Sequence, residues 1–153
     1  MKSFLKENLL HILCFILLCL LFIFWGRTIA AEINRNTSTK NLYTLTARLS
    51  CLEHLGWSVD ETSETTKEVV IPKPLDSVWE NYNKLQTPAG FDLAKHQGEK
   101  ATCYTYIATN FPYDVGEPVY VNLLIADGTL IGGDCMTRAL DGFMLPLDRR
   151  YLP

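Results

Sequence analysis

The chain has 153 residues, of which 48% are hydrophobic and 20% are charged, and its formal net charge is −3. This length suits one ordinary domain, and the apolar content excludes wholesale disorder. A protein that grips nucleic acid over its whole surface carries a basic excess, so we expect no nucleic-acid partner. The charge is divided along the chain, because residues 1–30 carry +2 and residues 31–153 carry −5.

Residues 9–26 predict a transmembrane anchor, because His11 is their only polar side chain. A helix of about 17 residues spans about 26 Å, the lower limit for crossing a hydrocarbon core. The alternative is a secretory signal cleaved before Ala31. The length of the apolar stretch, and the position of Arg27 between it and the small residues, favour the uncleaved anchor.

The predicted topology is that of a single-pass protein of the cell membrane. Counting positive charges on the two sides of the anchor gives a near tie. We expect a cytoplasmic N-terminus and an extracytoplasmic C-terminal domain, because a short lysine-bearing leader usually stays inside. The chain then divides into an N-terminal tail, the anchor, a polar spacer, a single α+β domain and a C-terminal tail, at residues 1–8, 9–26, 27–41, 42–147 and 148–153.

Two amphipathic helices are predicted after the spacer. The first has a leucine stripe at helical spacing, formed by Leu42, Leu45, Leu49, Leu52 and Leu55. Thr44 or Thr46 is suited to cap it, and Gly56 to end it. A short strand is expected at residues 68–71. The second helix begins near Pro74, and its apolar face consists of Leu75, Val78, Trp79, Tyr82 and Leu85.

Three further strands are predicted over residues 101–109, 119–126 and 129–136. Asp127 and Gly128 between the last two are typical of a two-residue hairpin turn. The predicted fold class is therefore α+β. An N-terminal transmembrane helix precedes helix, strand and helix, and a three-stranded antiparallel meander follows, covered by helices on one face.

The hairpin loops predict which side chains share a face of the sheet. A loop over residues 111–117 places Cys103 opposite Ile125, and the tight turn places Asp134 opposite Val121. One face is then aliphatic, and the other is rich in tyrosine. Tyrosine is favoured at interfaces, so the candidate binding residues are Tyr104, Tyr106, Tyr120 and Asn122, with Asp134 as an unusual polar group on the aliphatic face. Burial of the tyrosine-rich face under the C-terminal segment is the open alternative.

Cysteine spacing predicts neither a disulfide nor a metal site. The predicted register separates Cys103 from Cys135 by about 16 Å along the strand, whereas a disulfide needs Cα atoms within about 7 Å. Cys51 and His54 have the spacing of half a zinc site, but a second pair is missing. We therefore expect no metal, no cofactor and no catalytic residue.

Several short blocks occur in one order through residues 44–147. They include Leu55-Gly56-Trp57, Val70-Ile71-Pro72, Gly90-Phe91-Asp92-Leu93, Val121-Asn122-Leu123-Leu124 and Leu140-Asp141-Gly142-Phe143-Met144. Together they resemble a family of small bacterial membrane-anchored proteins, the domain of unknown function DUF4830. The resemblance implies one extracytoplasmic α+β domain behind one anchor, without an assigned activity. Its members often continue with His-Gly where this chain has Leu145-Pro146.

The leading functional hypothesis is a non-enzymatic, membrane-tethered module that binds an envelope protein or glycan. No nucleophile with its base, carboxylate pair or nucleotide loop can be assembled from the residue spacing. The alternative is a small extracytoplasmic hydrolase or thiol enzyme with its site near Asp134, where Asp141, His96 and Cys135 would converge. A third hypothesis is an assembly subunit that also uses the anchor helix.

Overall fold

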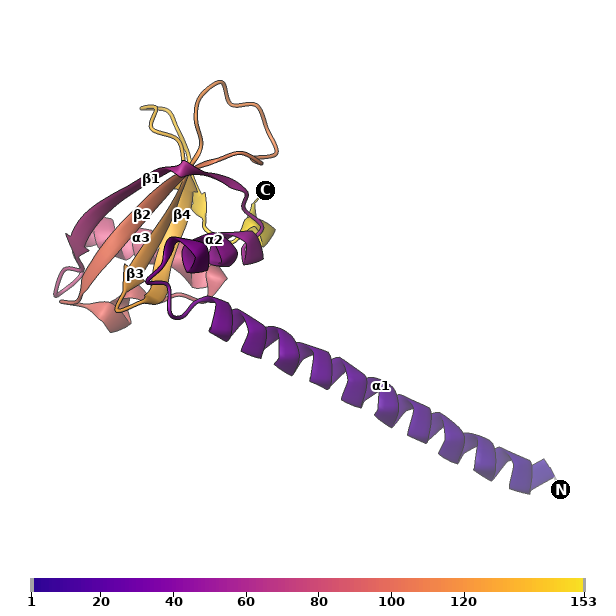
Figure 1. Ribbon diagram of the computed structural model, residues 1–153. Coiled ribbons are helices and arrows are strands. Elements are labelled where there is room, and N and C mark those ends of the chain that lie inside the picture. Colours follow the sequence, from indigo (N-terminus) through magenta and orange to yellow (C-terminus); the bar gives the residue numbers. More distant parts are fainter. Residues whose placement is uncertain (1, 153) are drawn as a thin grey trace. The chain divides into compact units, whose positions relative to one another are not determined.

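The computed structural model describes the backbone of residues 2–152 and the side chains of residues 11–29 and 39–152. Met1 and Pro153, at the ends of the two predicted tails, lie outside the described residues. The described part of the chain comprises one long N-terminal helix and an α+β domain (Figure 1).

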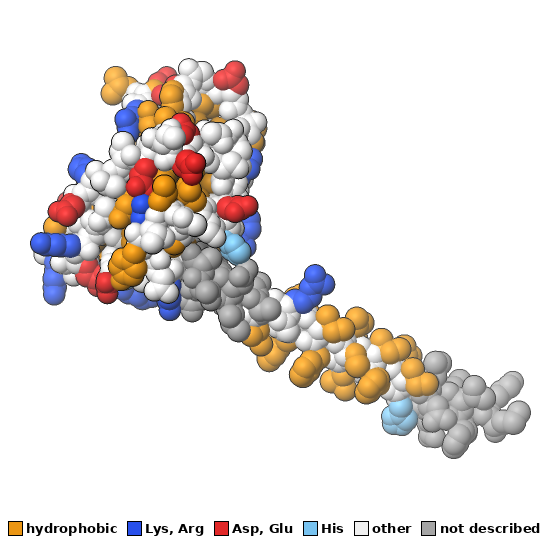
Figure 2. Space-filling view, in the orientation of Figure 1, with side chains coloured by type: hydrophobic (Ala, Val, Ile, Leu, Met, Phe, Trp, Pro, Cys, Tyr) orange, Lys and Arg blue, Asp and Glu red, His pale blue; other side chains and the backbone are white. Residues whose placement is uncertain are grey.

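Helix α1 (Lys2–Ser38) belongs to the first of two compact units, Met1–Thr37, and the domain forms the second, Ser38–Pro153. Within α1, the stretch His11–Ile29 has a mean hydropathy of 2.4 and is long and apolar enough to cross a membrane. Apolar side chains project from the visible sides of this stretch (Figure 2). The helix is compatible with the predicted membrane anchor, and it continues through most of the predicted spacer.

The domain is built on a five-stranded antiparallel sheet whose strands follow one another in chain order. The strands are β1 (Val59–Val70), β2 (Lys100–Ala108), β3 (Tyr120–Ala126), β4 (Thr129–Met136) and β5 (Met144–Pro146). The α+β class is confirmed, but the prediction of three meander strands is incomplete. The sequence predicts only the end of β1, because most of this strand is charged or hydroxylated, as suits an exposed edge. The strand β5 is short and contains a proline, which an edge position tolerates.

Local sequence signals begin and end the helices of the domain. Thr44 caps α2 (Leu45–His54), and Gly56, with a φ of +89°, follows it in the left-handed conformation. Asp76 caps α3 (Ser77–Gln86) by accepting two backbone N–H bonds. Three short 3-10 helices complete the domain: η1 (Thr87–Ala89), η2 (Leu93–His96) and η3 (Arg149–Tyr151). Both predicted amphipathic helices are thus present.

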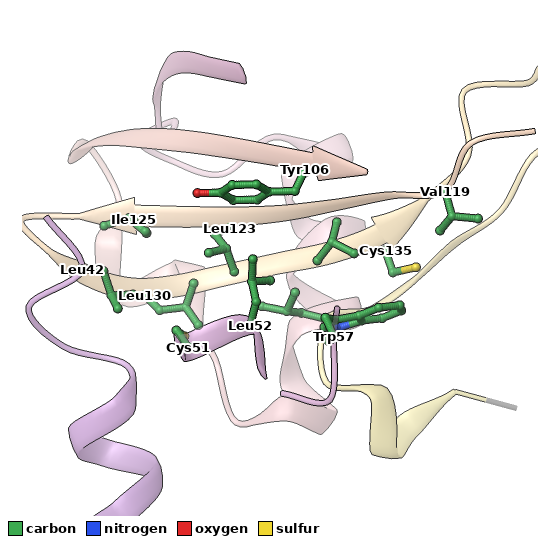
Figure 3. Packing of buried hydrophobic residues seen from close by; sticks show 12 residues of the cluster. Leu42, Cys51, Leu52, Trp57, Tyr106, Val119, Leu123, Ile125, Leu130 and Cys135 are labelled. Carbon is green, nitrogen blue, oxygen red and sulfur yellow. The ribbon is translucent and has the colours of Figure 1, made fainter. Parts of the chain in front are cut away.

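Helices cover both faces of the sheet, so the prediction of a single covered face is wrong (Figure 1). On the face that we call the α2 side, Leu52 and Trp57 pack with Tyr106 and Leu123 in the larger buried cluster (Figure 3). On the opposite face, the α3 side, residues of α3 and η2 pack over a smaller buried cluster. Its buried members are Ile71, Leu93, Ala101, Leu124, Ala126 and Ile131.

The pairing of β2 with β3 differs by one residue from the predicted register. Cys103 lies opposite Leu124, whereas the predicted loop places it opposite Ile125. Because strand side chains alternate between the two faces, this shift moves every side chain of β2 to the other face. Tyr104 and Tyr106 therefore lie on the α2 side.

The pairing of β3 with β4 begins as predicted, with Ile125 opposite Leu130. The register then shifts by one residue beyond this pair, which is the signature of a β-bulge. As a result Asp134 lies opposite Asn122, whereas the sequence predicts Val121 as its partner. The bulge therefore brings Asp134 to the α3 side of the sheet, where it meets Asn122.

Candidate functional site

The structure separates the candidate binding residues into two groups. Tyr104 and Tyr106 lie on the α2 side, whereas Tyr120, Asn122 and Asp134 lie on the α3 side. The prediction that the three tyrosines and Asn122 share one face is therefore wrong. Its cause is the one-residue shift of β2, which the eleven-residue connection after β2 leaves open.

Tyr106 belongs to a buried polar cluster under α2. Its ring is fully buried among the core residues (Figure 3), and its hydroxyl donates to Glu64 of β1. Arg48 of α2 forms an ion pair with Glu64 at 2.8 Å, and its guanidinium lies 4.0 Å from the centre of the Tyr104 ring. Burial raises the pKa of Tyr106, with the hydrogen bond to Glu64 as a second cause. These contacts give both tyrosines structural partners.

On the α3 side, four polar side chains form a hydrogen-bond network. The hydroxyl of Tyr82 donates to Oδ2 of Asp134 over 2.7 Å. The side-chain amide of Asn122 donates to Oδ1 of Asp134 over 2.7 Å. Thr105 in turn donates to Oδ1 of Asn122 over 2.6 Å. This network links α3 to strands β2, β3 and β4.

Asp134 is a buried carboxyl group with only 4% of its surface exposed. Burial raises its pKa above the usual value, against the opposing effect of hydrogen bonds from Tyr82 and Asn122. The pKa of Tyr82 is raised well above its usual value, first by burial and then by the negative charge of Asp134. Burial therefore disfavours the ionised form of Asp134, and the hydrogen bonds from Tyr82 and Asn122 favour it.

An open groove of about 630 Å³ lies between α3 and the sheet, with Asp134 in its lining. We call it the α3 groove, and its lining residues are Val69, Val78, Trp79, Asn81, Tyr82, Leu85, Cys103, Leu124, Asp134 and Met144. Most of these side chains are apolar. Val78 and Met144 are 72% and 47% exposed, so both are open to solvent at the groove. Such a volume falls in the range of pockets that hold small ligands.

The end of α3 approaches the sheet closely at two glycines of β4, and Gly132 leaves the space for it. Oε1 of Gln86 accepts a hydrogen bond from the backbone N–H of Gly133 over 2.9 Å. A Cβ atom at Gly132 would lie 3.1 Å from the same oxygen. Because Tyr82 lies one helical turn before Gln86, this approach brings its hydroxyl within reach of Asp134. The glycines thus have the packing role that small residues play in strands.

The four residues expected to converge in the enzyme alternative, Asp134, Asp141, His96 and Cys135, have different environments in the structure. Cys135 is buried in the cluster on the α2 side, away from the face that carries Asp134. His96 of η2 pairs with Glu99 over 2.9 Å, and Asp141 is exposed in the loop after β4. Among the described residues, no group of three His, Cys, Asp or Glu side chains is placed to hold a metal ion.

The cysteines of the sheet also lie on different faces. Cys103 lies opposite Leu124 on the α3 side, and Cys135 lies opposite Val121 on the α2 side. Both thiols are free, and burial raises the pKa of each, to about 12 for Cys135. Cys103 lines the α3 groove as a protonated thiol. A protonated thiol is a weak nucleophile.

From the sequence, Trp79 and Tyr82 are expected only on the apolar face of the second helix, and not in a binding site. The signal that could have found them is the tyrosine hydroxyl on that face, since a buried hydroxyl needs a partner. Asp134 is the partner of the Tyr82 hydroxyl. This hydrogen bond depends on the β3–β4 register, which the sequence does not determine.

The family model for the domain of unknown function DUF4830 matches residues 51–135. This range contains α2 from Cys51 onward, α3, the strands β1 to β3 and most of β4, and thus nearly all of the groove. No curated protein and no solved structure matches the chain. Since the matched range covers more than half of the 153 residues, the chain belongs to the DUF4830 family.

Proposed function

We propose that the protein is a single-pass membrane protein whose extracytoplasmic domain is a non-enzymatic binding module. The apolar helix His11–Ile29 supports the membrane anchor by its length and composition. The lysine-bearing leader before it supports a cytoplasmic N-terminus. In this proposal the anchor holds the domain at the outer surface of the membrane, where it meets its ligand.

The α3 groove is the proposed binding site, in place of the tyrosine-rich face. A groove of about 630 Å³ with apolar walls and a few convergent polar groups is typical of small-molecule sites. Apolar walls are poorly suited to a glycan, whose many hydroxyl groups need hydrogen-bonding partners. The ligand is therefore a small molecule with a largely apolar body.

The hydrogen bonds of Asp134 favour binding over catalysis. A general acid or base needs a proton path to the substrate and a partner group at hydrogen-bonding distance. Both oxygens of Asp134 accept bonds from Tyr82 and Asn122, which act as structural donors. The thiol of Cys103 in the same groove has a raised pKa, which disfavours a thiol enzyme.

Fluorine NMR of the full chain in lipid nanodiscs tests the proposed site. The protein contains three tryptophans, which can be labelled with fluorotryptophan: Trp25 in the anchor, Trp57 on the α2 side and Trp79 in the groove. Phenethyl alcohol, a small and mainly apolar probe, should shift the Trp79 resonance in a saturable way and leave that of Trp57 in place. A change of Trp25 alone would report partition of the probe into lipid.

A matched pair of variants locates the binding. Val78→Phe enlarges a side chain that lines the groove and should weaken phenethyl alcohol binding by several-fold. Val70→Phe makes the same change at a 58% exposed position of β1 outside the groove and should leave the affinity unchanged. If Trp79 does not respond to the probe, or if both variants behave alike, the groove is not the binding site.

A further inference from the structure

Asp134 is a buried carboxyl group that forms no ion pair with a described cation. Ion pairs between described side chains join Arg48 to Glu64, Lys95 to Asp92, His96 to Glu99 and Arg150 to Asp148. None of them includes Asp134. Buried carboxylates in proteins are normally paired with a positive group. A positive group from outside the described chain would therefore complete this site.

The groups around Asp134 stabilise its charge without neutralising it. Tyr82 from α3 and Asn122 from β3 donate one hydrogen bond each, and both are neutral. Cys103 from β2 carries a raised pKa and is neutral as well. Lys67 of β1 lies opposite Cys103, and its positive charge acts to lower the pKa of that thiol. A carboxylate has about four acceptor positions, so two remain for a further donor.

The rest of the groove indicates which kind of cation fits. A divalent metal ion prefers six or more oxygen ligands, and here one carboxylate stands among apolar side chains. Trp79 and Tyr82 line the same groove, with their rings edge to face at 5.8 Å between centroids. Aromatic rings attract organic cations, and apolar walls take up an aryl or alkyl body. An ammonium group can also donate the hydrogen bonds that the free acceptor positions need.

We propose that the α3 groove binds a small organic amine, whose protonated primary ammonium group pairs with Asp134 while its apolar body lies against Trp79. The inference rests on the proposed function, because it takes the α3 groove as the binding site. It adds the charge and chemical class of the ligand. The ligand is held by one ion pair with Asp134 and by apolar contact with the other lining residues of the groove.

Three probes of similar size on the unmodified protein test this inference: phenethylammonium, phenethyl alcohol and phenylpropanoate. The full chain in nanodiscs is titrated near neutral pH, and the Trp79 fluorine resonance is followed. Phenethylammonium should bind about ten-fold more tightly than phenethyl alcohol, since a buried charge-assisted contact adds at least this much, and phenylpropanoate should bind most weakly. Equal affinities of the ammonium and the alcohol would overturn the amine assignment while leaving the groove as a binding site.

A variant and a pH series then identify the carboxylate. In Asp134→Asn the ratio of the ammonium affinity to the alcohol affinity should fall to near one, with the Trp57 resonance reporting that the fold is intact. Acidification of the unmodified protein should lower the same ratio, because Asp134 becomes protonated while the ligand keeps its charge. A ratio that is insensitive to both changes would overturn the pairing with Asp134. Tighter binding of a lysine-containing peptide than of phenethylammonium would overturn the small-molecule assignment.

Discussion

Asn122 and Asp134 lie directly opposite each other on β3 and β4, and the amide of Asn122 donates to Oδ1 of Asp134 over 2.7 Å. Asp134 of this pair lines the α3 groove, and Asn122 holds its carboxyl group from the neighbouring strand. Its geometry depends on the bulge that precedes it in β4. The same strand pairing therefore determines both the packing of the sheet and the chemistry of the groove.

Removal of the Tyr82 hydroxyl should destabilise the domain. In Tyr82→Phe the carboxylate of Asp134 loses one of its two donors in a buried position, which costs about 1–3 kcal/mol of unfolding free energy. Tyr43→Phe is the matched control, because Tyr43 donates to Asp127 at an exposed position. In urea unfolding, Tyr82→Phe should clearly lower the unfolding free energy, whereas Tyr43→Phe should lower it by less than about 0.5 kcal/mol. Equal losses would contradict the buried role of the Tyr82 hydroxyl.

The stability of the domain should depend on pH through Asp134. Its pKa is higher in the folded state than the usual value, so the folded state binds more protons between these two pKa values. The unfolding free energy therefore falls as pH rises through this window. Asp134→Asn should flatten that fall in urea titrations at a series of pH values. Asp60→Asn should not flatten it, because hydrogen bonds from Thr62 lower the pKa of Asp60.

Substitution of the two glycines of β4 should have unequal effects. A Cβ atom at Gly133 would lie 2.7 Å from a side-chain atom of Leu147 and closer still to the backbone oxygen of Asn122. Gly133→Ala should therefore cost about 2 kcal/mol or more, as strained overpacking does. At Gly132 the nearest atom belongs to the side chain of Gln86, at 3.1 Å, so Gly132→Ala should cost less. Thermal unfolding compares the two, and a reversed order would contradict the packing of β4.

The ion pair between Arg48 and Glu64 should couple α2 to the edge strand β1. Arg48 is buried, so Glu64→Gln leaves its charge poorly compensated and should cost about 1–3 kcal/mol. A double-mutant cycle with Arg48→Met separates this coupling from the loss of each side chain. Chemical unfolding of the four proteins should give a coupling above about 0.5 kcal/mol. Additive losses would mean that the two side chains stabilise the domain independently.

The proposed topology predicts the outcome of reporter fusions in a bacterial host. Alkaline phosphatase fused to the C-terminus should be active, and a green fluorescent protein fusion should be dark, because the domain is placed outside the cytoplasm. The intact chain should remain in the membrane fraction with residues 9–26 attached. The reverse pattern of reporters would invert the orientation. Recovery of a soluble product that begins near Ala31 would replace the anchor by a cleaved signal.

The apolar N-terminal helix, the helix ends and the tight turn follow from neighbouring residues, and the sequence predicts them. The apolar composition of His11–Ile29 identifies the helix that could cross a membrane. Thr44 and Gly56 mark the ends of α2 through a cap and a left-handed residue. Asp127 and Gly128 form the predicted tight turn, both with positive φ. Each of these signals acts within a few residues of the structure that it specifies.

The candidate site depends on contacts between distant residues, which only the tertiary structure decided. Tyr82 and Asp134 are 52 positions apart in the chain, and they meet because a bulge shifts β4 by one residue. A strand presents alternate side chains to opposite faces, so a single-residue shift moves each side chain to the other face of the sheet. Apolar and polar residues of β2 alternate too weakly to select one register. The packing of α2 and α3 on the two faces selected it, and with it the residues that line the groove.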